Sequence, residues 1–113
     1  MSKKTITIIK LKPFLQSIKK IFTHDDLKEL EEFLVAFPAH GDVIPGTGGL
    51  RKLRWAAKGK GKRGGARVIY FYYVNKDNVY LLAAYTKNDK TDLSSNEKQA
   101  FKKMIEFLVK GEQ

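Results

Sequence analysis

The sequence predicts an α+β fold in which an antiparallel β-sheet is packed by helices, in the order β-α-α-β-β-β-α. Three observations predict it. Some stretches alternate apolar and polar residues, as strands do, and others repeat apolar residues at helical spacing. A third is size, because 113 residues, 42% of them hydrophobic, suffice for a single domain (1–113) with a core. We expect the helices on one face of the sheet and the other face open.

The N-terminal part predicts a strand followed by two helices. Residues 5–11 are rich in β-branched side chains and alternate, which is typical of a strand. Pro13 suits the first turn of a helix whose apolar stripe ends at Phe22. Thr23 is the predicted N-cap of a second helix, which Pro38 ends. A loop rich in glycine and proline follows.

The remaining chain predicts three strands and a closing helix. The strands span residues 50–57, 66–74 and 79–86. Residues 75–78 have the composition of a turn, so the last two strands form an antiparallel hairpin. Ser94 and Glu97 form a Ser-x-x-Glu capping box, which indicates that the final helix begins there.

The chain is strongly basic, and its charge is unevenly distributed. Its 22 Lys and Arg residues and 12 Asp and Glu residues give a formal net charge of +10. No acidic residue occurs between Val43 and Lys76, so the positive charge is concentrated in one part of the fold. Such an excess attracts an anionic partner, and nucleic acid is the first candidate.

Composition also argues against several classes of site. The absence of cysteine excludes disulfides, thiolate metal sites and a thiol nucleophile. Carboxylates are sparse near the basic segment and no metal-ligand spacing occurs, so we expect neither a metal nor a cofactor. No apolar run approaches the roughly 18 residues that a membrane span needs, and no export signal is evident. We expect a soluble cytoplasmic protein without a membrane partner.

Residues 59–64 form a basic loop rich in glycine. Their pattern, Gly-Lys-Gly-Lys-Arg-Gly, matches the dinucleotide fingerprint G-x-G-x-x-G, but a strand follows instead of the helix that this fingerprint requires. The loop and its flank supply candidate phosphate-binding residues, namely Lys58, Lys60, Lys62 and Arg63. A solvated hairpin tip accounts for the same composition equally well.

Four other cations are candidates for a catalytic cluster. Lys52, Arg54 and Arg67 lie on neighbouring predicted strands and, if they share a face, form a cationic floor that Lys87 can join. Attack of a ribose 2'-hydroxyl on its phosphodiester builds negative charge on a five-coordinate phosphorus, which such groups stabilise. This chemistry requires no metal. The alternative interpretation is a solvated strand face.

The same chemistry needs a base and an acid, roles that histidine usually fills. His24 and His40 are expected away from the basic strands, so we interpret both as structural or surface residues. A lysine whose pKa is lowered by neighbouring cations can serve instead, which makes Lys87 or Lys52 the candidate. Tyr85 shares a predicted strand face with Lys87 and either stacks on a base or packs in the core.

The residues from Gly41 to Arg54, GDVIPGTGGLRKLR, and from Lys58 to Tyr70, KGKGKRGGARVIY, resemble the HigB-type branch of the RelE/ParE toxins. The resemblance extends to the YTKN ending at Asn88 and the DLSSNE ending at Glu97, over about the C-terminal two-thirds of the chain. It implies the toxin of a type II toxin–antitoxin system, an mRNA interferase. Such an endoribonuclease cuts mRNA in the 30S decoding site of the ribosome, inhibits translation, and is neutralised by a cognate HigA-like antitoxin.

The resemblance also implies site residues. The basic strand pair of the family falls on Lys52 and Arg54, its arginine before Val-Ile-Tyr on Arg67, and its late-strand basic position on Lys87. The sequence departs from RelE at Asn88, where RelE has an arginine, and in having no tyrosine in the segment that follows. These departures leave the roles of acid and base unassigned. By the same resemblance, the free toxin is a monomer.

Two other functions are compatible with the sequence. A ParE-like toxin shares the fold but poisons DNA gyrase and cuts no RNA. A plain RNA-binding module would depend on the basic loop alone and would bind with a steep salt dependence.

Overall fold

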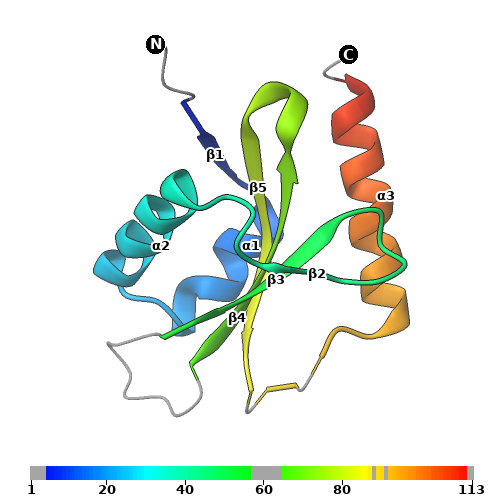
Figure 1. Ribbon diagram of the computed structural model, residues 1–113. Helices are drawn as coiled ribbons and strands as arrows, with labels where there is room; N and C mark the ends of the chain where they lie inside the picture. The colour runs from blue at the N-terminus through cyan, green and yellow to red at the C-terminus, as the bar shows by residue number, and fades with distance from the viewer. Residues whose placement is uncertain (1–4, 57–64, 88, 91, 112–113) are drawn as a thin grey trace.

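The computed structural model describes residues 5–56, 65–87, 89–90 and 92–111 (Figure 1). Its elements, in chain order, are β1 (Thr7–Lys10), α1 (Lys12–Ser17), η1 (Ile18–Lys20), α2 (His24–Ala36), β2 (Asp42–Val43), β3 (Leu50–Trp55), β4 (Ala66–Tyr73), η3 (Val74–Lys76), β5 (Asn78–Thr86) and α3 (Ser95–Gly111). The predicted fold class and element order are confirmed, with β2 as a short addition. No helix in these ranges is long and apolar enough to cross a membrane.

The strands form a five-stranded sheet in the order β1-β5-β4-β3-β2. The three ladders from β2 to β5 are antiparallel, as predicted, but β1 pairs with β5 in parallel. The prediction of an antiparallel sheet was therefore wrong for the β1–β5 ladder alone. The reason is that only strands joined by a tight turn are held antiparallel by their connection, whereas the chain between β1 and β5 crosses the whole fold.

Helices cover both faces of the sheet, so the expectation of one open face was wrong. On one side α1, η1 and α2 pack against β3, β4 and β5, with Phe14, Ile18, Leu30, Leu34, Val68, Tyr70 and Leu81 buried. On the other side lies α3, and this second core holds Leu50, Ile69, Tyr80, Leu82, Tyr85, Leu93 and Ile105. Figure 1 shows α2 and α3 on opposite sides of the central strands. Strands that are apolar on both faces need cover on both, and β5 is buried along almost its whole length.

The two predicted helix starts are confirmed in atomic detail. The Thr23 hydroxyl accepts a hydrogen bond from the Asp26 N–H at 3.1 Å, and the Asp26 carboxylate accepts one from the Thr23 N–H at 2.9 Å. Ser94 and Glu97 form the same reciprocal pair at the start of α3, at 3.1 and 2.9 Å. Each box satisfies two backbone donors that a helix start leaves without a partner.

A β-bulge interrupts the ladder between β4 and β5. Ile69 pairs with Ala83, but the next residue, Tyr70, pairs with Leu81, so β5 has one residue more than β4 at this point. Because side chains alternate along a strand, the extra residue reverses the alternation in the second half of β5. Beyond the bulge, Arg67 pairs with Tyr85.

Candidate functional site

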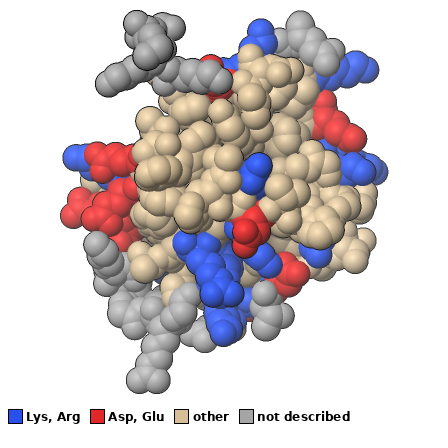
Figure 2. Space-filling view, in the orientation of Figure 1, with Lys and Arg blue, Asp and Glu red and all other residues tan. Residues whose placement is uncertain are grey.

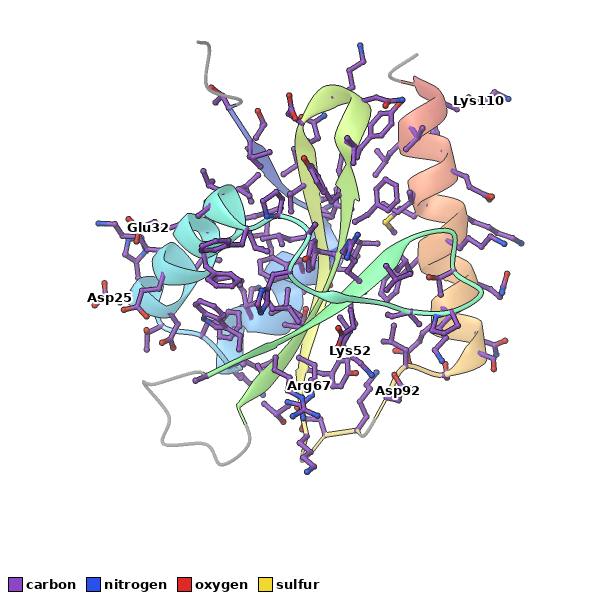
Figure 3. All side chains as sticks on the ribbon, in the orientation of Figure 1. Asp25, Glu32, Lys52, Arg67, Asp92 and Lys110 are labelled. Carbon is purple, nitrogen blue, oxygen red and sulfur yellow. The ribbon has the colours of Figure 1, made fainter. Side chains whose placement is uncertain are left out.

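The register of β3 and β4 brings three predicted site residues together. Arg54 and Arg67 are direct partners across the ladder, and Lys52 lies two residues before Arg54 and therefore on the same face. Lys52 and Arg67 lie close together with Asp92 at one end of the sheet (Figure 3). The predicted proximity of these three cations is therefore observed, although α3 covers the rest of that face.

A hollow of about 500 Å³ lies at this end of the sheet, and its described lining residues are His40, Gly41, Asp42, Lys52, Leu53, Arg54 and Arg67. Figure 2 shows blue Lys and Arg side chains gathered at the lower centre of the molecule, with red acidic groups beside them. Like charges directly opposite each other in a ladder are unfavourable, so the Arg54–Arg67 pair costs stability without an anion nearby. The hollow is thus suited to an anionic ligand.

Asp92 supplies negative charge next to this hollow. Its carboxylate lies 3.6 Å from the Lys52 ammonium and 3.7 Å from that of Lys98. The Leu93 N–H also donates a hydrogen bond to it at 2.8 Å. This backbone hydrogen bond is the main cause that lowers the pKa of Asp92; burial opposes it, and the charges of Lys52 and Lys98 add to it. Asp92 therefore stays ionised and holds Lys52 against the segment that leads into α3.

The structure places Tyr85 inside the core. Its side chain is only 4% exposed and belongs to the core under α3, while the Lys90 ammonium lies 5.7 Å from the centre of its ring. Its hydroxyl has no hydrogen-bond partner among the described residues. Burial, followed by the charge of Asp92, raises the pKa of this phenol, against the opposing effect of Arg67. Of the two interpretations of Tyr85, this position favours packing beside Arg67 over stacking on a base.

The other predicted site residues are less closely associated with the hollow. Lys87 is exposed, one residue beyond β5, and is not among the described residues that line the hollow. The candidate phosphate-binding residues Lys58, Lys60, Lys62 and Arg63 lie outside the described residues. Both interpretations of the basic loop therefore stay predictions.

Sequence reasoning missed His40. The expectation that it lies away from the basic strands was wrong, because the chain after α2 turns back and β2 pairs with β3, which places His40 at the hollow. A two-residue strand leaves too short an alternation to be recognised in the sequence. His24 was placed correctly: it is exposed at the start of α2, away from the hollow.

Two side chains hold the loop that carries His40. One Arg51 nitrogen donates hydrogen bonds to the carbonyls of Ala39 and Gly41, at 3.0 and 2.7 Å. The Tyr70 hydroxyl accepts a hydrogen bond from the Gly41 N–H at 2.8 Å. A Cβ at Gly41 would lie 2.8 Å from a Tyr70 ring carbon, so the close approach requires glycine. The loop backbone is thus fixed on both sides of His40.

The described residues contain no group of three or more His, Asp or Glu side chains placed to hold a metal ion. What the hollow offers within its described lining is a set of positive charges, one imidazole and the carboxylate of Asp42. Such a set can bind a phosphodiester, stabilise added negative charge on it and exchange protons with it.

Comparison with known proteins agrees with this description. A family model described as the RelE toxin of the RelE/RelB toxin–antitoxin system matches residues 40–113, which is more than half of the chain. The protein is thus of the class of toxins that belong to toxin–antitoxin systems. The chain belongs to the RelE toxin family. Its place in the HigB-type branch stays a prediction.

Two solved structures from E. coli have a similar fold. One is the free toxin RelE with two arginines mutated to alanine; it is 12% identical, with a TM-score of 0.56 over 78% of this chain and 90% of that one. The other is the intact RelBE toxin–antitoxin complex; the matched chain is 14% identical, with a TM-score of 0.55 over 72% of this chain and 95% of that one. At this identity the similarity establishes the fold alone.

Proposed function

We propose that this protein is the HigB-type toxin of a type II toxin–antitoxin system and that it cleaves mRNA on translating ribosomes. The observation that carries the proposal is the direct pairing of Arg54 with Arg67 beside Lys52 at one hollow. Three cations brought together by strand register form a site for a phosphodiester. Membership of the RelE toxin family supports the same conclusion.

In the proposed reaction, the ribose 2'-oxygen attacks the adjacent phosphorus and the bond to the 5'-oxygen breaks. Negative charge grows on the non-bridging oxygens in the transition state, and Arg67 and Arg54 stabilise it there. Arg67 lies between Arg54 and Tyr85 in the ladders, so its starting position is fixed by the sheet. Lys52 orients the phosphate and donates a proton to the leaving oxygen, while Lys87 adds positive charge at the end of β5.

The proposed partner is a cognate HigA-like antitoxin with an acidic segment that covers the hollow. The positive formal charge of the chain supports this choice, because opposite charge favours association. One of the two structural neighbours is a toxin–antitoxin complex. We propose that the free toxin is a monomer of 12.9 kDa, which size-exclusion chromatography with light scattering tests directly.

Primer extension on an abundant mRNA after brief induction tests the proposed activity. The comparison includes the wild type, Arg67→Ala, Arg67→Lys and the control Lys28→Ala, an exposed cation on α2 outside the hollow. We expect cuts within translated codons for the wild type and the control. These cuts should disappear in Arg67→Ala and be much reduced in Arg67→Lys, because an ammonium cannot bind two phosphate oxygens as a guanidinium does.

Circular dichroism should show that Arg67→Ala is folded. Persistent cutting by this folded variant would contradict the role of Arg67. Intact mRNA together with accumulated DNA breaks would instead identify a gyrase poison. Tight, salt-sensitive RNA binding without cleavage on translating ribosomes would identify a plain RNA-binding module.

A further inference from the structure

We propose that Lys98 is a further phosphate-binding residue of this site and that Asp92 is its internal counterion, which pairs with Lys98 and Lys52 in the free protein and releases both to RNA. This inference rests on the proposed ribonuclease function and adds to it a cation from α3, which begins at Ser95. The observation that carries it is a single carboxylate placed between two ammonium groups.

Asp92 joins the two lysines through one oxygen each. Its Oδ1 atom lies 3.6 Å from the Lys52 ammonium, and its Oδ2 atom lies 3.7 Å from the Lys98 ammonium. Figure 3 shows Asp92 beside Lys52, on the segment that leads into α3. Because Lys52 lines the hollow, the shared carboxylate brings the ammonium of Lys98 next to the basic cluster of β3 and β4.

These two ion pairs are loose enough to be exchanged for contacts with a ligand. Charge-assisted hydrogen bonds are shorter, about 2.7–2.9 Å. The side chains of Lys52, Lys98 and Asp92 are 34%, 29% and 47% exposed, and ion pairs open to solvent contribute little to stability. An incoming phosphate therefore displaces the carboxylate from both ammonium groups at low cost.

The carboxylate of Glu97, in contrast, is committed to the start of α3. The Lys90 ammonium lies 2.6 Å from it, and the Ser94 N–H donates a hydrogen bond to it at 2.9 Å. Asp92 also has one short contact, since the Leu93 N–H donates to it at 2.8 Å. That contact holds the anion to the backbone, whereas a lysine ammonium moves on a flexible stem. The lysines therefore turn toward the ligand while Asp92 stays in place.

The cations follow one another in a way that suits a strand of RNA. Lys52 lies two residues from Arg54 on β3, which is roughly 6.5 Å along the strand, and Lys98 follows across the carboxylate. Lys102 lies one turn further along α3 on the same face, and its Cε would lie 3.8 Å from a Cβ at Gly48, in the loop between β2 and β3. An RNA strand with its scissile phosphate at the arginines therefore presents a neighbouring phosphate to Lys98.

The test is a double-mutant cycle on binding, with the full-length purified chain and a fluorescent DNA oligonucleotide, which lacks the 2'-hydroxyls needed for cleavage. The variants are Lys98→Ala, Asp92→Asn and the two together. Asparagine keeps an oxygen that accepts from the Leu93 N–H, so the charge is lost but this contact is not. The controls are Lys103→Ala, an exposed cation on α3, and Asp89→Asn, an exposed carboxylate on the segment before α3.

Lys98→Ala should weaken binding several-fold and lower the slope of the salt dependence by about 0.7, as expected for the loss of one phosphate contact. In the Asp92→Asn background the same change should weaken binding more, by roughly ten-fold, because Lys98 no longer has to leave a carboxylate. Asp92→Asn alone should tighten binding by up to about five-fold, more than Asp89→Asn does.

An effect of Lys98→Ala no larger than that of Lys103→Ala would overturn the role of Lys98. Equal effects of Lys98→Ala with and without the charge of Asp92 would overturn the role of the counterion. Circular dichroism checks that each variant is folded, and Lys98→Gln, which keeps most of the side chain, takes the place of an unfolded Lys98→Ala. Either result leaves the proposed function intact when the wild type cuts mRNA. Absence of cleavage by the wild type would overturn the proposed function without changing the measured coupling in DNA binding.

Discussion

Gly41 shows how a single residue shapes the hollow. Its N–H reaches the Tyr70 hydroxyl because no side chain stands between them, and this contact joins the loop of His40 to the centre of β4. The sequence alone predicted only that Gly41 lies in a loop and Tyr70 in a strand. Propensity does not indicate a long-range hydrogen bond between a glycine N–H and a tyrosine, because it depends on a tertiary contact 29 positions away.

Replacing Gly41 by Ala should destabilise the protein by roughly 1–3 kcal/mol, because the new methyl group would overlap the Tyr70 ring. Chemical denaturation of the two proteins measures the difference. Gly111→Ala is the matched control, because a Cβ there meets nothing within 4 Å and the residue lies in a helix. Equal stability of Gly41→Ala and the wild type would show that the loop is not held as described.

At the residue scale, Asp92 should make the stability of the folded protein depend on pH. Its pKa is lowered in the folded state, so its contribution to stability is present above the unfolded pKa of roughly 4 and is lost as the pH falls through the lower folded value. Asp92→Asn should therefore destabilise the protein at pH 7 and have less effect at pH 3. The side chain is 47% exposed, so solvent screening should keep the difference below about 1 kcal/mol.

Thermal unfolding of the wild type and Asp92→Asn at both pH values measures this difference. Asp89→Asn is a suitable control on the same segment, since Asp89 is exposed and bonds to Thr86 instead of a lysine. A destabilisation by Asp92→Asn that grows toward pH 3 would contradict the assigned direction of the pKa shift.

At the scale of the elements, the signals that sequence carries best are local ones. The N-cap at Thr23, the capping box at Ser94 and the end of α2 before Pro38 each follow from residues within one helical turn, and all three were predicted. The parallel β1–β5 ladder depends on partners far along the chain, β2 is too short to show an alternation, and the β-bulge adds a single residue to β5; none of the three was predicted. Of the site, the face shared by Lys52 and Arg54 followed from alternation, whereas His40 and Asp92 required the tertiary fold.

The Thr23 cap offers a test at this scale. Thr23→Ala removes the hydroxyl that accepts from the Asp26 N–H and leaves a donor without its partner at the start of α2. We expect a loss of about 1 kcal/mol in the free energy of unfolding. Urea denaturation measures it, with Thr5→Ala, an exposed position before β1, as the control. A loss no greater than that of the control would mean that this cap contributes little.

At the scale of the whole molecule, the excess positive charge should control how tightly the protein binds nucleic acid. Binding of a cationic protein to single-stranded nucleic acid weakens with salt, with a slope of about 0.7 per neutralised phosphate in a double logarithmic plot. Arg54→Ala should lower that slope by about 0.7, the amount expected for the loss of one phosphate contact. The reason is that Arg54 is one of the three cations gathered at the hollow. Fluorescence anisotropy with an oligonucleotide that lacks 2'-hydroxyls measures binding without cleavage.

The same titration separates the two interpretations of the basic loop. A variant in which Lys58, Lys60, Lys62 and Arg63 are all replaced by Gln should show a further decrease in slope if the loop binds phosphates. An unchanged slope would identify a solvated tip. A variant with four other lysines replaced by Gln controls for the loss of four charges as such, since these lysines are exposed on helices outside the hollow: Lys12, Lys28, Lys103 and Lys110.

The bulge between β4 and β5 has a consequence for building chimaeras with related chains. Up to Leu82, even-numbered positions of β5 contribute to the core under α3; beyond the bulge that core receives Tyr85, while Ala84 joins the opposite one. A segment exchanged across this point keeps each side chain in its own core only when the donor strand carries the same extra residue. Crossovers placed at the hairpin of η3, before β5 begins, avoid this constraint, because the whole strand then comes from one parent.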